Sequence, residues 1–217
     1  MNVKFSIPNI FNKDLNLVKK IIKSGWLTHG KYTSLFEEEF KKFTGAKYCT
    51  TVSSCTAGLH ISCIASGFKK GDEVIVPTNS FIASAGSVVQ TGATPVFCDV
   101  LDDFNIDVND AKKRITANTK AIMPVHLTGR PADMPAVKAM AQKYDLFVIE
   151  DAAQAIGASL HGEKVGSMGD LAAFSLHPLK NLFIMGDGGF ITMKCPFIYE
   201  KIKKIRNHGL IDRNTCA

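Results

Sequence analysis

The sequence lacks long hydrophobic runs. None of its apolar stretches approaches the roughly 20 residues that a membrane-spanning helix requires. Its opening residues, Met-Asn-Val-Lys-Phe-Ser, also lack the apolar core of a secretion signal. These absences argue against an integral membrane protein and against an exported one. The sequence therefore predicts a cytoplasmic protein with no membrane partner.

Paired metal-binding motifs are also missing. The chain has six cysteines, none of them in a C-x-x-C pair or at zinc-type spacing, and its six histidines include no H-E-x-x-H pair. Because no export signal accompanies the cysteines, we expect reduced thiols rather than a disulfide framework. We expect no metal site, so that His126, His177 and His208 serve in packing or in hydrogen bonds.

Charge is not concentrated in blocks of one sign. The formal net charge is +6, but the basic residues are spread along the chain, with a single run at 201–206, Lys-Ile-Lys-Lys-Ile-Arg. Alternation with isoleucine is typical of the solvated side of an amphipathic helix rather than of a surface for a phosphate backbone. We expect no nucleic-acid partner, although a diffuse positive field favours anionic substrates.

The chain does contain a regular alternation of strand-like and helix-like segments after Gly45. With 217 residues, 46% of them hydrophobic, and no repeat or linker, it is long enough to bury the core of one large domain. Two helices are expected first, at 14–23 and 33–42, the second opening with a Ser/Thr cap. Strands are then expected at 48–52, 73–77, 94–100, 120–125, 146–149, 171–175 and 190–193. Helices are expected between them at 56–66, 80–90, 108–115 and 134–143.

This order predicts an α/β fold. Alternating strands and helices favour a three-layer sandwich, in which a mainly parallel sheet of roughly seven strands is covered by helices on both faces. Open sheets of this kind bind ligands at the carboxyl ends of their strands. Residues that follow the predicted strands are therefore the candidates for chemistry.

Two predicted strands are followed by chemically useful side chains. Asp151 and Gln154 come after the apolar run 146–149, and Lys180 follows the run 171–175, whose last residue is Ser175. Taken alone, a lysine is usually a solvated surface group and an aspartate after an apolar run usually caps a helix. Together they match the needs of pyridoxal phosphate (PLP). The lysine amine holds the cofactor aldehyde as a Schiff base, the carboxylate keeps the pyridinium nitrogen protonated, and the serine hydroxyl binds the phosphate.

A phosphate site is also expected where the first predicted strand passes into a helix. The segment 53–57, Ser-Ser-Cys-Thr-Ala, makes this connection, so the amides of Thr56 and Ala57 lie at a helix N-terminus, which favours anions. The alternative is an ordinary Ser/Thr cap of that helix.

At these residues the chain resembles the DegT/DnrJ/StrS family of sugar aminotransferases, which are PLP enzymes of fold type I. The resemblance runs from about Gly25 to Gly209. It is carried by the ordered motifs FEEEF (36–40), SCTA (54–57), PTNSF (77–81), EDAAQA (150–155), SLHPLK (175–180) and GDGG (186–189). Cys55 stands where the family usually has glycine, and Asp187 where it usually has glutamate.

The resemblance implies roles for individual residues. Phe81 would lie over the pyridine ring, where a core phenylalanine is the alternative from the sequence alone. Gln154 would approach another part of the ring, with a helix-surface amide as its alternative. Asp151 and Lys180 would be the catalytic residues, Lys180 moving a proton between the donor Cα and the cofactor. The family forms homodimers with the site at the interface, and residues 1–217 would be its PLP-binding large domain, including the N-terminal helices and without the C-terminal small domain.

The implied reaction transfers an amino group from an amino acid, usually glutamate in the family, to a keto-sugar nucleotide. The products of such enzymes enter surface polysaccharide, lipopolysaccharide or antibiotic synthesis. In related sugar dehydratases a histidine replaces the lysine, so Lys180 favours transamination. Two alternatives stay open: another fold type I reaction such as dehydration or racemisation, and a truncated fragment that binds cofactor or dimerises without turnover.

Overall fold

The computed structural model of the protein describes residues 7–210. Seven strands form one sheet in the order β1-β9-β8-β5-β4-β2-β3. Every neighbouring pair is parallel except the two pairs made by β9, which runs antiparallel to both β1 and β8. The strands are β1 (Tyr48–Val52), β2 (Glu73–Pro77), β3 (Thr94–Cys98), β4 (Thr119–Ile122), β5 (Phe147–Asp151), β8 (Leu171–Ser175) and β9 (Gly189–Met193). Two-residue strands β6 (Ser159–Leu160) and β7 (Glu163–Lys164) form a separate hairpin.

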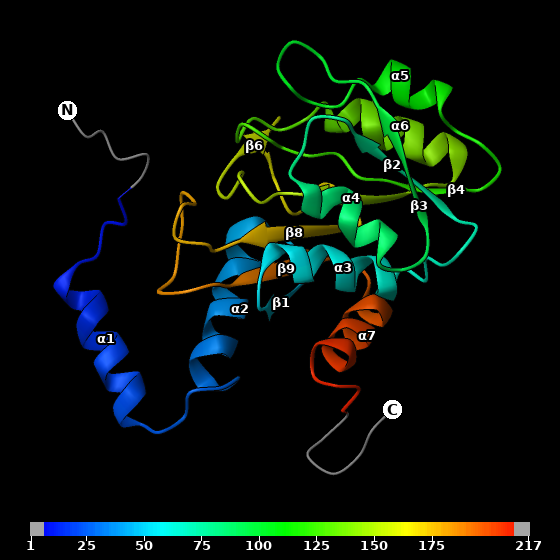
Figure 1. Cartoon of the computed structure of the whole chain (residues 1–217). Helices are drawn as coiled ribbons and strands as arrows, with labels where there is room; N and C mark the ends of the chain where they lie inside the picture. The colour runs from blue at the N-terminus through cyan, green and yellow to red at the C-terminus, as the bar shows by residue number, and fades with distance from the viewer. Residues whose placement is uncertain (1–6, 211–217) are drawn as a thin grey trace.

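Helices cover both faces of the sheet (Figure 1). The helices of the described chain are α1 (Asn12–Lys23), α2 (Lys31–Thr44), α3 (Cys55–Ala65), α4 (Ile82–Val89), α5 (Val108–Lys113), α6 (Met134–Tyr144) and α7 (Pro196–Arg206), and all except α1 pack on the sheet. One buried core lies between the sheet and α3, α4 and α7, and a second lies between the sheet and α2, α5 and α6. The predicted three-layer α/β sandwich with a mainly parallel, seven-stranded sheet is confirmed.

The central strands are apolar because both of their faces are covered. All five residues of β8 and all five of β9 are buried. Phe174 of β8 stacks on Phe190 of β9 with ring centroids 4.5 Å apart, and Phe40 of α2 packs on Phe190 from outside the sheet. Strands buried on both faces read as continuous apolar runs, which is the pattern that identified them in the sequence.

The element boundaries show where local sequence patterns fall short. The strands expected at 48–52, 73–77 and 171–175 have those bounds, whereas the runs expected at 94–100 and 120–125 end earlier, at Cys98 and Ile122. The residues after Cys98 and after Ile122 lie outside the regular strand pairing, and Val125 forms an isolated bridge to Asp151. The β6–β7 hairpin was not predicted.

The predicted Ser/Thr cap of the second helix is wrong. Helix α2 begins at Lys31, and its N-cap residue is Gly30, which makes no side-chain capping bond. Thr33 and Ser34 therefore lie inside the helix. The reason is visible in the loop before it, where the indole Nε1 of Trp26 donates to the backbone oxygen of His29 at 2.9 Å and shapes the entry to the helix.

Helix α7 is fastened to the sheet by a charged cluster. The Arg206 guanidinium donates to Glu37 Oε1 of α2 at 2.7 Å and to the backbone oxygen of Thr51 in β1 at 3.0 Å. The same Glu37 oxygen accepts the Thr51 N–H at 2.8 Å. The hydrogen bonds from Thr51 and the Arg206 charge outweigh the effect of burial and lower the pKa of Glu37. The run at 201–206 lies on this helix, and Ile202 is fully buried while the lysines beside it are more exposed, so the prediction of an amphipathic helix is confirmed.

A glycine at the start of β9 allows the loop before α3 to lie against the sheet. A Cβ atom added at Gly189 would come within 2.6 Å of the Phe174 oxygen, 2.6 Å of the Ser54 carbonyl carbon and 2.7 Å of the Cys55 nitrogen. All three neighbours are backbone atoms, so none of them can move aside as a side chain would. Gly189 thus sets the distance between the start of α3 and the end of β8.

Helix α1 extends away from the rest of the described chain in Figure 1, and none of its residues is buried. Among residues 7–210, no helix is long and apolar enough to cross a membrane.

Candidate active site

The candidate residues gather at the carboxyl edge of the parallel strands. Asp151 is the last residue of β5 and lies opposite Ala173 of β8 in the parallel register, so β8 reaches the same edge at Ser175. Helix α3 starts at this edge as well, because Cys55, its first residue, places its Sγ atom 4.0 Å from Asp151 Oδ1. Three separate segments of the chain thus meet around one carboxylate.

Asp151 is buried, with 4% of its surface exposed. Its Oδ2 atom accepts a hydrogen bond from Ser84 Oγ at 2.6 Å, and its Oδ1 atom accepts the Ala153 N–H at 3.2 Å. Burial raises the pKa of Asp151, while these two hydrogen bonds and the charge of Lys180 act in the opposite direction without cancelling the rise. A cation placed beside Asp151 would stabilise the ionised form of its carboxyl group against the cost of burial.

Lys180 lies on the loop after β8 with its amine held in place. Its Nζ atom donates to Gln154 Oε1 at 3.0 Å, so two of the predicted residues are in direct contact. The loop itself is a hydrogen-bonded turn, in which the Lys180 N–H donates to the His177 oxygen at 2.9 Å and the His177 N–H donates to Ser175 Oγ at 3.3 Å. The pKa values of Asp151 and Cys55 are raised by burial, and the charge of Lys180 opposes that rise at both groups.

The start of α3 carries the cap that was the alternative to a phosphate site. Ser54 is the N-cap residue, and its Oγ atom accepts the Ala57 N–H at 3.1 Å. Thr56, the second residue of the helix, is exposed. An anion at this helix end would therefore share the Ala57 amide with Ser54 or displace the Ser54 hydroxyl from it. The phosphate role of Thr56, Ala57 and Ser175 stays a prediction.

Phe81 is not a core residue. It is the N-cap residue of α4, and 71% of its surface is exposed. The core alternative is therefore wrong. The position of Phe81 over a cofactor ring stays a prediction. A bound ring would cover part of this exposed side chain and give it stacking contacts.

Sequence reasoning missed the serine that contacts Asp151. The sequence predicts for Ser84 only a place in a helix at 80–90, yet its side chain is fully buried and its hydroxyl donates to the carboxylate. Ser80, one helical turn earlier, lies 2.5 Å from Ser84 Oγ. Small hydroxyl residues spaced by four at the start of a helix that follows a strand end were the available signal.

The buried histidine near the site serves in packing and hydrogen bonding. His126 Nδ1 accepts the Ala132 N–H at 3.0 Å, so its Nε2 carries the proton and donates to Glu150 Oε2 at 3.1 Å. Glu150 also accepts the N–H groups of Gly166 and Gly169. Among residues 7–210, no three His, Cys, Asp or Glu side chains are grouped to hold a metal ion.

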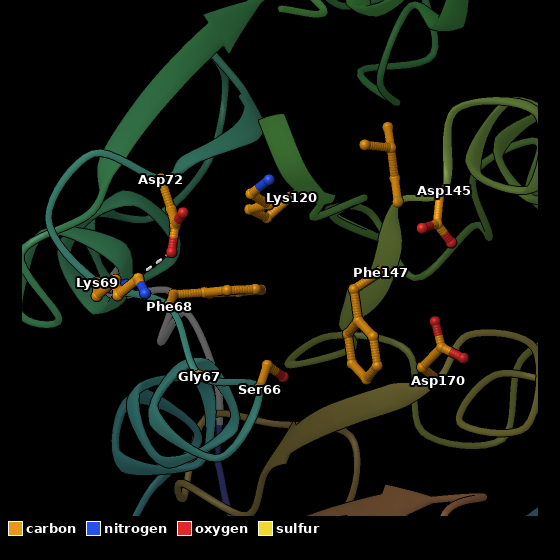
Figure 2. Close-up of a pocket in the computed structure, with 10 residues that line it drawn as sticks. Ser66, Gly67, Phe68, Lys69, Asp72, Lys120, Asp145, Phe147 and Asp170 are labelled. Atoms are coloured by element: carbon orange, nitrogen blue, oxygen red, sulfur yellow. Dashed lines mark hydrogen bonds between the residues drawn. The ribbon is translucent and has the colours of Figure 1, made fainter. Parts of the chain in front are cut away.

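A hollow lies at the edge of the sheet opposite to Asp151 (Figure 2). This cavity, of about 700 Å³, is open and is lined by the loop between α3 and β2 and by the starts of β4, β5 and β8, with Lys69, Lys120, Asp145 and Asp170 on its walls. None of the predicted site residues lines it. Charges of both signs face one another across it, and the carboxylate of Asp170 is occupied by the Val148 N–H at 2.9 Å. The predicted site residues lie at the other edge, at the carboxyl ends of β5 and β8.

Comparison with known proteins places this geometry in a family. The chain is 40% identical over 207 residues to the spore coat polysaccharide biosynthesis protein SpsC of Bacillus subtilis, covering 95% of this chain and 53% of that protein. It is 37% identical over 206 residues to GDP-perosamine synthase of Vibrio cholerae, covering 94% of this chain and 56% of that protein. The chain thus spans about half the length of these relatives.

Solved structures share the fold. The aminotransferase from Psychrobacter cryohalolentis is 36% identical with a TM-score of 0.92, over 95% of this chain and 53% of that one. Spr1654 from Streptococcus pneumoniae, in its PLP form, is 30% identical with a TM-score of 0.93, over 100% of this chain and 62% of that one; its pyridoxamine phosphate (PMP) form has also been solved. The model of the DegT/DnrJ/EryC1/StrS aminotransferase family matches residues 8–216. The chain therefore belongs to the DegT/DnrJ/EryC1/StrS aminotransferase family.

Proposed function

We propose that this chain is the PLP-binding large domain, residues 1–217, of an aminotransferase that moves an amino group from an amino acid to a keto-sugar nucleotide. The observation that carries the proposal is the meeting of Asp151, the Lys180–Gln154 pair and the N-terminus of α3 at one edge of the sheet. A buried carboxylate, a held amine and a helix N-terminus are the three groups that PLP requires.

The residues present fit the cofactor. Asp151 would hold the ring nitrogen, since its pKa is raised by burial and a cation beside it would offset that burial. Ser175 and the amides of Thr56 and Ala57 would hold the phosphate, and Phe81 and Gln154 would contact the ring. PLP supplies an electron sink for the carbanion formed at the amino-acid Cα.

Lys180 and Asp151 would carry the chemistry of the protein itself. Lys180 Nζ, in its neutral form, would take the proton from the donor Cα, and Gln154 Oε1 would keep the amine within reach by accepting its hydrogen bond. Asp151 would keep the proton on the ring nitrogen, where it is needed throughout the reaction. Removing either group would leave binding contacts in place and remove a proton-handling group.

The substrates are proposed from charge and from the relatives. A net charge of +6 favours an anionic substrate such as a nucleotide sugar. The printed functions of two relatives, a spore coat polysaccharide biosynthesis protein and a GDP-perosamine synthase, support an amino sugar destined for a surface polysaccharide or lipopolysaccharide. We further propose a glutamate donor, a homodimer with the site at its interface, and a cytoplasmic location.

Reaction with glutamate tests the proposal. PLP-loaded protein is mixed with glutamate in the absence of a sugar, and 2-oxoglutarate is measured together with the absorbance of the bound cofactor. We expect stoichiometric 2-oxoglutarate and conversion of the cofactor to the PMP form. Cofactor binding without any keto acid from glutamate or other amino acids would instead favour a dehydratase or a non-catalytic cofactor-binding fragment.

A further inference from the structure

Two serines at the start of α4 connect this helix to the Asp151 carboxylate. Ser80 lies in the loop before α4 and Ser84 lies in its first turn, fully buried. Their Oγ atoms are 2.5 Å apart, and Ser84 Oγ is 2.6 Å from Asp151 Oδ2. Neither serine belongs to the set of residues proposed above to contact the cofactor.

The direction of these hydrogen bonds follows from the chemistry of the groups. An ionised carboxylate only accepts, so the single hydroxyl proton of Ser84 is directed at Asp151. The Ser84 oxygen then accepts the proton of Ser80. A chain of hydroxyls with all its protons pointing toward a carboxylate is polarised along its length, so each bond strengthens the next.

The two carboxylate oxygens of Asp151 are held by different parts of the chain. Oδ1 accepts the Ala153 N–H and faces the Cys55 thiol of α3, whereas Oδ2 accepts from Ser84 of α4. The charged or titratable groups that act on the carboxylate are Lys180 from the loop after β8, His126 from the segment after β4, and Cys55. Rotation of the carboxyl group about its Cβ–Cγ bond would break the contacts on both oxygens.

We infer that Ser84, supported by Ser80, is a positioning residue that fixes the orientation of the Asp151 carboxylate and favours its ionised form. The inference deepens the proposed function and rests on it for the catalytic role of Asp151. It also links two parts of the site, because Phe81 lies between the two serines in the sequence. The segment that would place an aromatic ring on the cofactor is thereby tied to the carboxylate that would hold the cofactor nitrogen.

The experiment compares three variants with a control from the same helix. Ser84→Ala removes the hydroxyl that reaches Asp151, Ser84→Thr keeps a hydroxyl there, and Ser80→Ala removes only the supporting hydrogen bond. Ser87→Ala is the matched control, since Ser87 is 1% exposed in α4 and its hydroxyl donates to the Ser84 backbone oxygen instead of to the carboxylate.

Two measurements are made on each protein. The first is the titration of the Asp151 carboxyl carbon by NMR in ¹³C-aspartate-labelled, cofactor-free protein, with the resonance assigned from Asp151→Asn. The second is the dissociation constant of PLP, measured by absorbance. The carboxyl titration does not depend on the cofactor, so it tests the inference even if the proposed function fails.

We expect Ser84→Ala to raise the titration midpoint of Asp151 by about one pH unit, equivalent to about 1.4 kcal/mol, and to weaken PLP binding about tenfold. Ser80→Ala should give a smaller change of the same sign, and Ser84→Thr should restore both values toward those of the unsubstituted protein. An unchanged midpoint in Ser84→Ala, or an equal rise in Ser87→Ala, would overturn the inference. A shifted midpoint in a protein that binds no PLP at all would support the role of Ser84 and count against the proposed function.

Discussion

Substitution of Gly189 by alanine tests how tightly the site depends on backbone contacts. The added Cβ atom would lie 2.6 Å from the Phe174 oxygen and 2.7 Å from the Cys55 nitrogen, while ordinary van der Waals contacts begin at 3.4 Å. Strands β8 and β9 and the start of α3 would therefore have to separate by nearly 1 Å. Overpacking a buried position typically costs about 1 to 3 kcal/mol, and with three backbone neighbours we expect about 3 kcal/mol.

The same displacement would reach the candidate site. Ser175 follows Phe174 directly at the end of β8, and Cys55 at the start of α3 contacts Asp151. Moving the end of β8 away from the start of α3 would therefore change the space in which a phosphate would lie. Because a hydrogen bond to a charged group contributes about 1.5 to 3 kcal/mol, the loss of one phosphate contact should weaken PLP binding by about tenfold or more in Gly189→Ala, even under conditions where it is folded.

The assay is urea unfolding followed by circular dichroism, together with a PLP titration by absorbance. Gly86→Ala provides the matched control, because Gly86 lies within α4 and a Cβ atom there would meet nothing within 4 Å. Alanine in place of glycine inside a helix should stabilise the chain by roughly 0.5 to 1 kcal/mol. A Gly189→Ala protein as stable as the unsubstituted chain, with normal PLP affinity, would refute the argument that backbone contact at Gly189 positions the phosphate loop.

Three further predictions concern ionisable groups. Borohydride reduction of PLP-loaded protein followed by peptide mapping should place the pyridoxyl group on Lys180, and its appearance on Lys164 or Lys194 instead would contradict the site assignment. Because burial raises the pKa of Asp151, the stability that its neutral form contributes to the cofactor-free chain is complete below the ordinary carboxyl range and is lost as pH rises through the raised pKa. Asp151→Asn should remove this part of the pH dependence in urea unfolding, and in single-turnover assays of the loaded protein it should slow the reaction with glutamate severely; an unchanged rate would rule out the proton-holding role. The pKa of Glu37 is lowered, so its contribution to stability is present above the ordinary glutamate value and is lost as pH falls; Glu37→Gln should cost about 1 to 3 kcal/mol at neutral pH, and a loss that is equally large at pH 3 would contradict the electrostatic explanation.

The fold was predictable because its central strands are buried on both faces. Segments such as 171–175 read as continuous apolar runs, and their alternation with helical patterns predicts a parallel sheet without any knowledge of long-range contacts. Strand ends were less predictable. Residues 123–125 are as apolar as β4 itself, but beyond Ile122 the regular strand pairing is reduced to an isolated bridge between Val125 and Asp151.

The site was predictable only in part, for a physical reason. Asp151, Gln154 and Lys180 follow strands that the sequence reveals, so their meeting at one edge follows from the topology. Ser84 is 67 residues from Asp151 along the chain, and nothing in its neighbourhood shows which carboxylate it faces. The cap made by Ser54 was expected only as the alternative, because a serine before a helix serves equally well as a cap and as a neighbour of an anion.

The position of β9 constrains the order in which the protein can fold during synthesis. In the described sheet β1 is an edge strand whose neighbour is β9, and β9 separates it from β8. A ribosome that has completed Ser175 but not Gly189 has made the strands that carry Asp151 and Ser175, while β1 and the start of α3 still lack the strand that joins them to the sheet. The candidate site is therefore assembled only after β9, which ends at Met193, has been translated, about nine-tenths of the way along these 217 residues. We expect the cofactor to bind a chain whose sheet is already complete.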